Sequence, residues 1–141
     1  MIAYFDTSAV IPLLIEEPGS QRASRLWDAA ERVVSVRLIY AEARAALAQA
    51  VRVGRIEGHE VPGLVVELDD LYRQLDRADV DDALVQRAGD LAQEHALRGY
   101  DAVHLAAAER LAGPEVVLVA GDGAFRAAAA AIGLAVGDTS T

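Results

Sequence analysis

Short apolar runs rich in β-branched residues alternate along this chain with longer segments of helical periodicity. The clearest run covers residues 115–120, and residues 2–5 and 31–36 have the same character. Strands of this kind, which are continuously apolar and separated by amphipathic helices, are typical of parallel sheets. The pattern therefore predicts an α/β fold with a mostly parallel central sheet of about four to five strands.

Glycine, proline and helix-capping residues divide the rest of the chain into further elements. Gly99, for example, is predicted to end a helix that begins near Asp81. We expect helices over residues 37–55, 59–75, 81–97 and 101–111, helices that begin after residues 6–8, 18–20 and 121–123, and short strands at 77–80 and 134–136. A chain of 141 residues without repeats or linkers fits one domain, which we place at residues 1–137, with a fraying polar tail at 138–141.

The residue types that are missing exclude several kinds of chemistry. The chain has no cysteine, which excludes a disulfide framework, a thiolate metal site and a cysteine nucleophile. All 13 basic residues are arginine, so Schiff-base chemistry and a P-loop, which need a lysine amine, are also excluded. The net charge of −9 argues against a protein that coats nucleic acid, so any contact with nucleic acid must be local.

The apolar runs are too short to suggest a membrane protein. None approaches the roughly 18 residues that a membrane-spanning helix needs. The N-terminal residues also lack the basic region and the long apolar segment of a signal peptide. We therefore expect a cytoplasmic protein with no membrane contact.

Three aspartates stand where a strand or a turn leads into a helix. Asp6 directly follows the first predicted strand, Asp122 follows the strongest one, and Asp101 opens a helix. In a parallel sheet the carboxyl ends of the strands meet at one edge, where ligands bind. Taken singly, each aspartate is better explained as a helix N-cap, because aspartate is common at such turns for that reason alone.

Glu42 lies on the apolar face of its predicted helix. At about 100° per residue, Arg37, Arg44 and Arg55 share the polar face, whereas Glu42 lies roughly 140° from Arg37 and close to Leu38. A buried and unpaired carboxylate costs several kcal/mol or shifts its pKa. A buried ion pair with an arginine is the alternative. We favour a role in a site, because the arginines of the helix itself point away.

These four acids would repel one another strongly if the fold brought them together. Two unit charges about 4 Å apart repel by about 4 kcal/mol at an effective dielectric constant near 20. A cation among them would relieve the repulsion, and oxygen ligands without cysteine select Mg²⁺ or Mn²⁺ over zinc. Such ions usually act on phosphate esters, by activating a water and neutralising developing charge. The residues therefore point to metal-dependent phosphoryl chemistry.

Other polar residues carry weaker signals, each with two explanations. His104 shares a helix face with Asp101 and could bind a metal, but we favour a hydrogen-bonded packing residue. Thr7 and Ser8 could bond a carboxylate or a metal-bound water, or cap a helix. A stripe of arginines on the helix of Glu42 could contact RNA phosphates or simply face solvent.

Each of the four acids lies in a short apolar motif. The motifs are Tyr-Phe-Asp-Thr-Ser-Ala-Val at 4–10, Tyr-Ala-Glu-Ala-Arg-Ala-Ala-Leu at 40–47, Tyr-Asp-Ala-Val-His-Leu-Ala-Ala at 100–107 and Val-Leu-Val-Ala-Gly-Asp at 117–122. In this order they resemble the motifs of PIN-domain ribonucleases, specifically VapC-type toxins of bacterial toxin–antitoxin pairs. By position, Asp6, Glu42 and Asp101 correspond to the metal-binding acids of that family, and Asp122 to the fourth acid of the site. The family often has threonine where this chain has Ala120.

The resemblance implies a three-layer α/β/α domain, a homodimer, and dependence on Mg²⁺ or Mn²⁺. It implies endonucleolytic cleavage of structured RNA, such as transfer or ribosomal RNA, with Asp6 and Asp101 holding the metal and Glu42 and Asp122 supporting it. It also implies a cognate antitoxin whose basic tail covers the acidic site.

Two other functions compete with the metal-dependent endoribonuclease. An aspartyl-phosphate phosphatase would use Asp6 as nucleophile. However, a second aspartate two residues later is absent, and so is lysine. A non-catalytic interaction module would use the acidic groove only to hold a partner. Such a module would show no metal-dependent turnover once its partner is removed.

Overall fold

Strands and helices alternate along the chain, as the sequence pattern predicts. The computed structural model describes residues 1–139. Its elements are, in order, β1 (Ile2–Phe5), α1 (Thr7–Leu14), α2 (Ser20–Ala29), β2 (Arg32–Val36), α3 (Ile39–Arg52), the 3-10 turn η1 (Gly58–Glu60), α4 (Val61–Gln74), β3 (Asp76–Ala78), α5 (Asp82–His95), α6 (Gly99–Leu111), β4 (Val116–Ala120), α7 (Gly123–Ala131) and β5 (Ala135–Asp138).

The strands form one sheet in the order β3-β2-β1-β4-β5, and every pairing in it is parallel. Tyr4 of β1 lies opposite Val34 of β2 and Leu118 of β4. The chain adds β2 and β3 on one side of β1, and β4 and β5 on the other. The direction of strand order therefore reverses between β1 and β4, which is where ligands bind in open sheets of this type.

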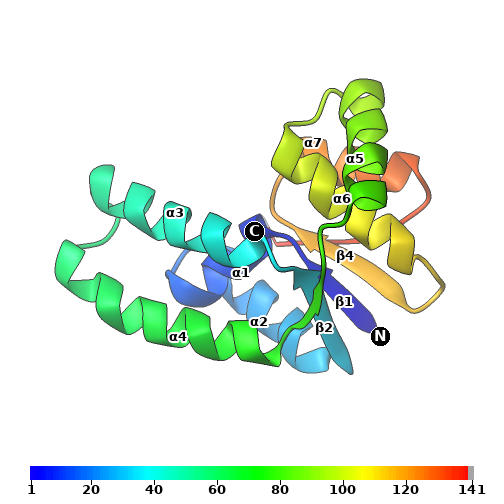
Figure 1. Cartoon of the computed structure of the whole chain (residues 1–141). Coiled ribbons are helices and arrows are strands. Elements are labelled where there is room, and N and C mark those ends of the chain that lie inside the picture. The colour runs from blue at the N-terminus through cyan, green and yellow to red at the C-terminus, as the bar shows by residue number, and fades with distance from the viewer. Residues whose placement is uncertain (140–141) are drawn as a thin grey trace.

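Helices cover both faces of the sheet, and the alternation of side chains along β1 shows how (Figure 1). Ala3 and Phe5 pack against α1, α3 and α4, whereas Tyr4 between them packs against α5, α6 and α7. The predicted three-layer α/β/α arrangement is thus confirmed. None of the helices within residues 1–139 is long and apolar enough to cross a membrane.

The link between α5 and α6 differs from the predicted one. Gly99 does not end α5; it is the first residue of α6, and Ala96 ends α5 with a positive φ of 52°. Asp101 consequently lies inside the first turn of α6, and Arg98 takes the N-cap position that we expected Asp101 to occupy. Three residues, Ala96 to Arg98, join these two packed helices, and Ala96 at the C-cap of α5 adopts the left-handed conformation that glycine more often takes there.

The C-terminal boundary also lies later than predicted. Asp138 is the last residue of β5, opposite Ala120, and it forms an ion pair with Arg126. Thr139 is buried. The polar tail expected from residue 138 therefore begins inside the folded unit, because the edge strand holds these residues. Residues 140–141 of that tail lie outside the described part of the chain.

Gly19 offers a test of how the end of the chain is held. A Cβ atom at Gly19 would lie 1.8 Å from the carbonyl oxygen of Thr139. We expect Gly19→Ala to lower the free energy of unfolding by about 1–3 kcal/mol, because the backbone must shift to admit the methyl group.

Chemical denaturation measures this effect, with Gly89→Ala as the matched control. Gly89 lies within α5, and a Cβ atom there would meet no atom within 4 Å. That variant should gain about 0.5–1 kcal/mol from the better helix propensity of alanine. Equal stability of the two variants would contradict the close approach of Gly19 to Thr139.

Candidate metal centre

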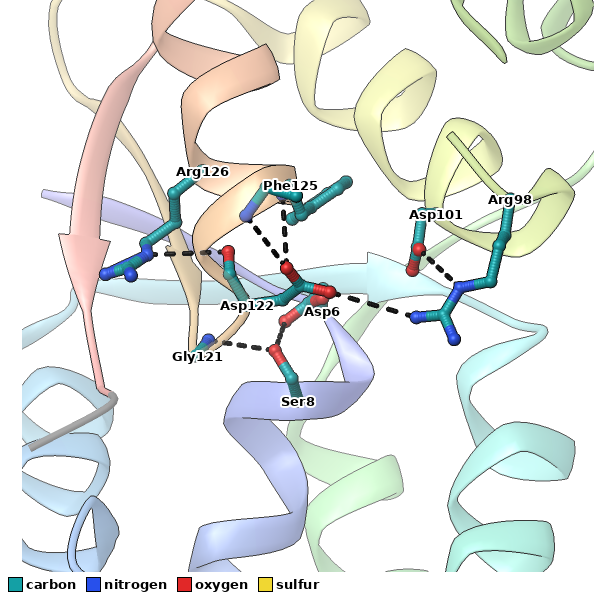
Figure 2. Close-up of polar contacts among 9 residues, drawn as sticks. Asp6, Ser8, Arg98, Asp101, Gly121, Asp122, Phe125 and Arg126 are labelled. Carbon is teal, nitrogen blue, oxygen red and sulfur yellow. Dashed lines mark hydrogen bonds and ion pairs between the residues drawn. The ribbon is translucent and has the colours of Figure 1, made fainter. Parts of the chain in front are cut away.

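A pocket of about 420 Å³ opens at the carboxyl edge of the sheet, where β1 and β4 meet the helices that follow. The fold brings all four acids selected from the sequence to its walls, and Figure 2 shows three of them, Asp6, Asp101 and Asp122. Asp6 comes directly after β1, Asp122 comes after β4, and Glu42 and Asp101 come from the first turns of α3 and α6. The pocket lining consists of Asp6, Thr7, Ser8, Leu38, Ala41, Glu42, Ala45, Arg98, Tyr100, Asp101 and Asp122.

Asp6 is the most deeply placed of these acids, with only 3% of its surface exposed. Asp6 occupies the N-cap position of α1, as the N-cap explanation expects, but its side chain makes no capping hydrogen bond of normal geometry. Capping therefore does not account for its buried carboxylate. Burial raises the pKa of Asp6 to about 6, opposed by attraction to His104 and the hydrogen bond from Ser8, and assisted by repulsion from Asp101. The fold therefore holds a carboxyl group where its charge is costly.

Ser8 ties Asp6 to the turn that carries Asp122. Its hydroxyl donates to Oδ1 of Asp6 over 2.7 Å and accepts from the amide of Gly121 over 2.8 Å. Of the two explanations that the sequence left open for Ser8, bonding to a carboxylate is the one observed. The contact to Gly121 spans 113 residues of sequence, so no local pattern could have indicated it.

Asp122, unlike Asp6, does cap its helix. Its Oδ1 atom accepts from the amides of Ala124 and Phe125 over 2.9 and 3.3 Å, so the N-cap explanation is confirmed for this residue. Its other carboxylate oxygen, Oδ2, lies 3.8 Å from the guanidinium group of Arg98. Asp122 therefore combines a structural role with a place on the pocket wall.

Glu42 contacts a histidine rather than an arginine. Its Oε1 atom lies 2.7 Å from Nε2 of His104, and its side chain is only 16% exposed. The alternative of a buried ion pair with an arginine is thus wrong. His104 is itself 1% exposed, and its Nδ1 atom lies 2.8 Å from the hydroxyl of Tyr4.

Arg98 is a residue of the pocket that the sequence reasoning missed. Figure 2 shows its guanidinium group reaching between Asp101 and Asp122; Nε lies 3.1 Å from Asp101 and Nη2 lies 3.8 Å from Asp122. Among the described residues that line the pocket it is the one basic side chain, and it is 80% exposed. Its position three residues before Asp101, one helical turn away, was the available signal.

The arginine stripe on and around α3 is largely engaged by other side chains. Arg37 pairs with Asp79, Arg55 pairs with Glu17, and Arg52 donates to Gln49. These contacts favour the explanation that the stripe is a solvated face rather than a phosphate-binding surface.

The four acids line one pocket without forming a ready-made cage. Within residues 1–139, no group of three or more histidine, aspartate or glutamate side chains already lies close enough together to hold a metal ion. Each acid instead has its own partner: Ser8 for Asp6, His104 for Glu42, Arg98 for Asp101, and helix amides for Asp122. Binding an ion would require some of these side chains to turn inward.

Comparison with known proteins finds a family model and near full-length relatives that match this chain. The model of the PIN domain matches residues 3–131. Ribonuclease VapC45 and ribonuclease VapC49 of Mycobacterium tuberculosis, from two strains, are each 39% identical to this chain over 135 residues, which is 96% of this chain and 94% of theirs.

Solved structures of toxins and toxin–antitoxin complexes share the fold. Mycobacterium tuberculosis VapC20, a sarcin–ricin loop cleaving toxin, is 20% identical, with a TM-score of 0.68 over 89% of this chain and 94% of its own. VapBC2 from Rickettsia felis, bound to a DNA fragment from its promoter, is 15% identical, with a TM-score of 0.64 over 98% of each chain. At these identities the likeness concerns the fold alone. The family match and the near full-length relatives together show that this chain belongs to the PIN domain family, with VapC ribonucleases as its relatives.

Proposed function

We propose that this protein is a metal-dependent endoribonuclease that acts as the toxin of a toxin–antitoxin pair. The observation that carries the proposal is the pocket at the switch point of the sheet, where Asp6 is buried with three further acids around it. Relatives that are named ribonucleases, and are 39% identical over almost the whole chain, support the same activity.

The chemistry of the donor set fits a hard divalent cation. All four acids offer carboxylate oxygens, and the chain has no cysteine, so Mg²⁺ or Mn²⁺ is favoured over zinc. Asp6 and Asp101 are the principal ligands in this proposal, and Glu42 and Asp122 support them. Asp122 is restricted to its Oδ2 atom, because Oδ1 is held by the amides of α7.

The other residues of the pocket would orient the acids and bind the substrate. A bound ion would supply an activated water and neutralise charge that develops on the phosphodiester. The hydroxyl of Ser8 fixes the orientation of Asp6, which must stay deep and ionised. Arg98 offers a guanidinium group at the pocket mouth, where its planar fork suits a phosphate of the substrate.

A protein partner is part of the proposal. Solved structures with this fold include a toxin–antitoxin complex from Klebsiella pneumoniae, which is 18% identical to this chain. The acidic pocket and the net charge of −9 suit a partner with a basic tail that covers the site. A homodimer of the toxin remains a prediction from the family resemblance.

Cleavage of total cellular RNA by the partner-free protein tests the proposed function. We expect discrete fragments with Mg²⁺ or Mn²⁺ and none with a chelator. Asp6→Asn and Asp101→Asn should each lower the rate by roughly 100-fold or more, because each removes a charged ligand. Asp28→Asn on the exposed face of α2 is the matched control and should cleave at the parent rate.

Cleavage at the parent rate by folded Asp6→Asn protein would contradict the proposal. A folded parent protein that binds metal but never cleaves RNA would favour the non-catalytic interaction module instead.

The burial of Asp6 predicts how the stability of the metal-free protein depends on pH. The folded protein holds the Asp6 proton up to about pH 6, whereas the unfolded chain releases it near 3.8. The folded state thus binds more protons between these values, so the contribution of Asp6 to stability falls as pH rises through this window. Asparagine carries no charge at any of these pH values, so Asp6→Asn avoids this loss of stability. The variant should therefore have a free energy of unfolding about 1–3 kcal/mol higher than the parent at pH 8.

Denaturation of the metal-free variant and parent at pH 4 and pH 8 measures this effect. The difference between them should shrink markedly at pH 4, where Asp6 is protonated in the folded protein. A variant that is less stable than the parent at pH 8 would contradict the cost assigned to the buried charge.

The contact of Arg98 with two of the acids predicts a competition with the metal. An exposed ion pair contributes at most about 1 kcal/mol, so a divalent ion can displace it. Arg98→Ala should therefore bind Mn²⁺ up to about fivefold more tightly than the parent does, as measured by calorimetric titration. Arg110→Ala, at the other end of α6 and paired with Asp81, should leave the affinity unchanged. Weaker Mn²⁺ binding by Arg98→Ala would show that this arginine does not oppose the ion.

A further inference from the structure

His104 joins three elements beneath the pocket. It lies on α6, its Nδ1 atom is 2.8 Å from the hydroxyl of Tyr4 on β1, and its Nε2 atom is 2.7 Å from Oε1 of Glu42 on α3. Tyr4 is fully buried and His104 is 1% exposed, so water does not compete for these contacts. The sequence reasoning favoured a hydrogen-bonded packing residue here, and these two contacts confirm it.

The partners of the ring determine where its proton lies. The carboxylate of Glu42 can only accept a hydrogen bond, so Nε2 of His104 must carry the proton and donate. The hydroxyl of Tyr4 can donate, which lets Nδ1 accept. The donation from Nε2 to Glu42 persists whether or not Nδ1 is also protonated, so the argument does not depend on the charge of the ring.

In this arrangement neither ring nitrogen of His104 is free to bind a metal. A histidine binds an ion through an unprotonated nitrogen that faces it. Both nitrogens of His104 are already engaged, Nδ1 by Tyr4 and Nε2 by Glu42, and the hydroxyl of Thr7 lies 3.3 Å from Nε2 as well. The ring instead holds one oxygen of Glu42 and leaves the other, Oε2, without this partner.

We propose that His104 is a positioning residue that holds Glu42 in the orientation needed to support a divalent ion, while Tyr4 fixes the ring of His104. The role rests on the proposed function, because it is directed at the metal of that site. Groups that hydrogen-bond a metal-binding side chain typically affect metal affinity by about 10–100-fold. His104 therefore acts through Glu42 and touches neither metal nor substrate.

Nuclear magnetic resonance of the metal-free protein tests the hydrogen bonds themselves. Long-range ¹H–¹⁵N spectra of histidine-labelled protein report which ring nitrogen carries a proton, and His104→Gln identifies the signals of His104. We expect a protonated Nε2 whose resonance shifts in Glu42→Gln, and an Nδ1 resonance that shifts in Tyr4→Phe. An unprotonated Nε2 would overturn the proposal without any metal or RNA in the sample.

Calorimetric titration with Mn²⁺ tests the consequence for the pocket. His104→Leu should weaken Mn²⁺ binding by about tenfold, because Glu42 loses its donor. His104→Gln should retain most of the affinity, because the glutamine amide can donate from nearly the position of Nε2. His59→Leu, at an exposed histidine in η1, is the matched control and should match the parent.

A double-mutant cycle separates positioning from a purely structural role. In a Glu42→Gln background, His104→Leu should cause no further loss of Mn²⁺ affinity, because the carboxylate through which it acts is gone. Two results would overturn the role of His104 but leave the proposed function intact. One is that His104→Leu lowers Mn²⁺ affinity equally in the parent and in Glu42→Gln. The other is that the parent binds Mn²⁺ and His104→Leu binds it just as tightly. A parent protein that binds no Mn²⁺ would overturn the proposed function and this role with it.

Discussion

The architecture of the pocket depends on one costly placement, the burial of the Asp6 carboxyl group at the end of the central strand. β1 has partners on both sides, and strand order reverses beside it, so the residue that follows β1 necessarily enters the crevice between the two halves of the sheet. Only 3% of Asp6 is exposed, and burial raises its pKa to about 6. Groups with pKa values raised in this way cluster at functional sites, which fits the role that we propose for Asp6.

The surroundings of the pocket limit that cost by giving each acid a separate partner. Ser8 bonds Asp6, His104 bonds Glu42, and Arg98 bonds Asp101. These partners differ in how readily they can be replaced. The Ser8 and His104 contacts are partly buried and hold their carboxylates, whereas Arg98 is 80% exposed and more easily displaced. Carboxylates held in place and a displaceable guanidinium group at the mouth are the arrangement expected of the metal site that we propose.

The sequence was sufficient to predict the layers of the fold and the positions of the four acids. β-Branched runs gave the strands, and helical periodicity placed Glu42 on an inward face, because both signals are local. The individual roles of the acids were not predictable in the same way. Asp6 and Asp122 both follow strands, yet Asp122 caps its helix and Asp6 does not, a difference that tertiary packing decides.

The contacts that organise the pocket lay beyond sequence reasoning because they join distant segments. Ser8 meets Gly121, and His104 meets Tyr4 and Glu42, across separations of 62 residues or more.

The end of β5 was missed for a related reason. Asp138 belongs to the sheet because it pairs with Ala120 and Arg126, neither of which is near it in sequence, while its own composition is typical of a tail.

The most direct test of the central claim is a crystal structure of the partner-free protein with Mn²⁺, located by its anomalous scattering. Our account predicts one strong peak in the pocket, within roughly 2.0–2.3 Å of carboxylate oxygens of Asp6 and Asp101, with Arg98 moved away from Asp101. A well-ordered pocket in which Mn²⁺ binds elsewhere, while Arg98 keeps its contact with Asp101, would contradict it.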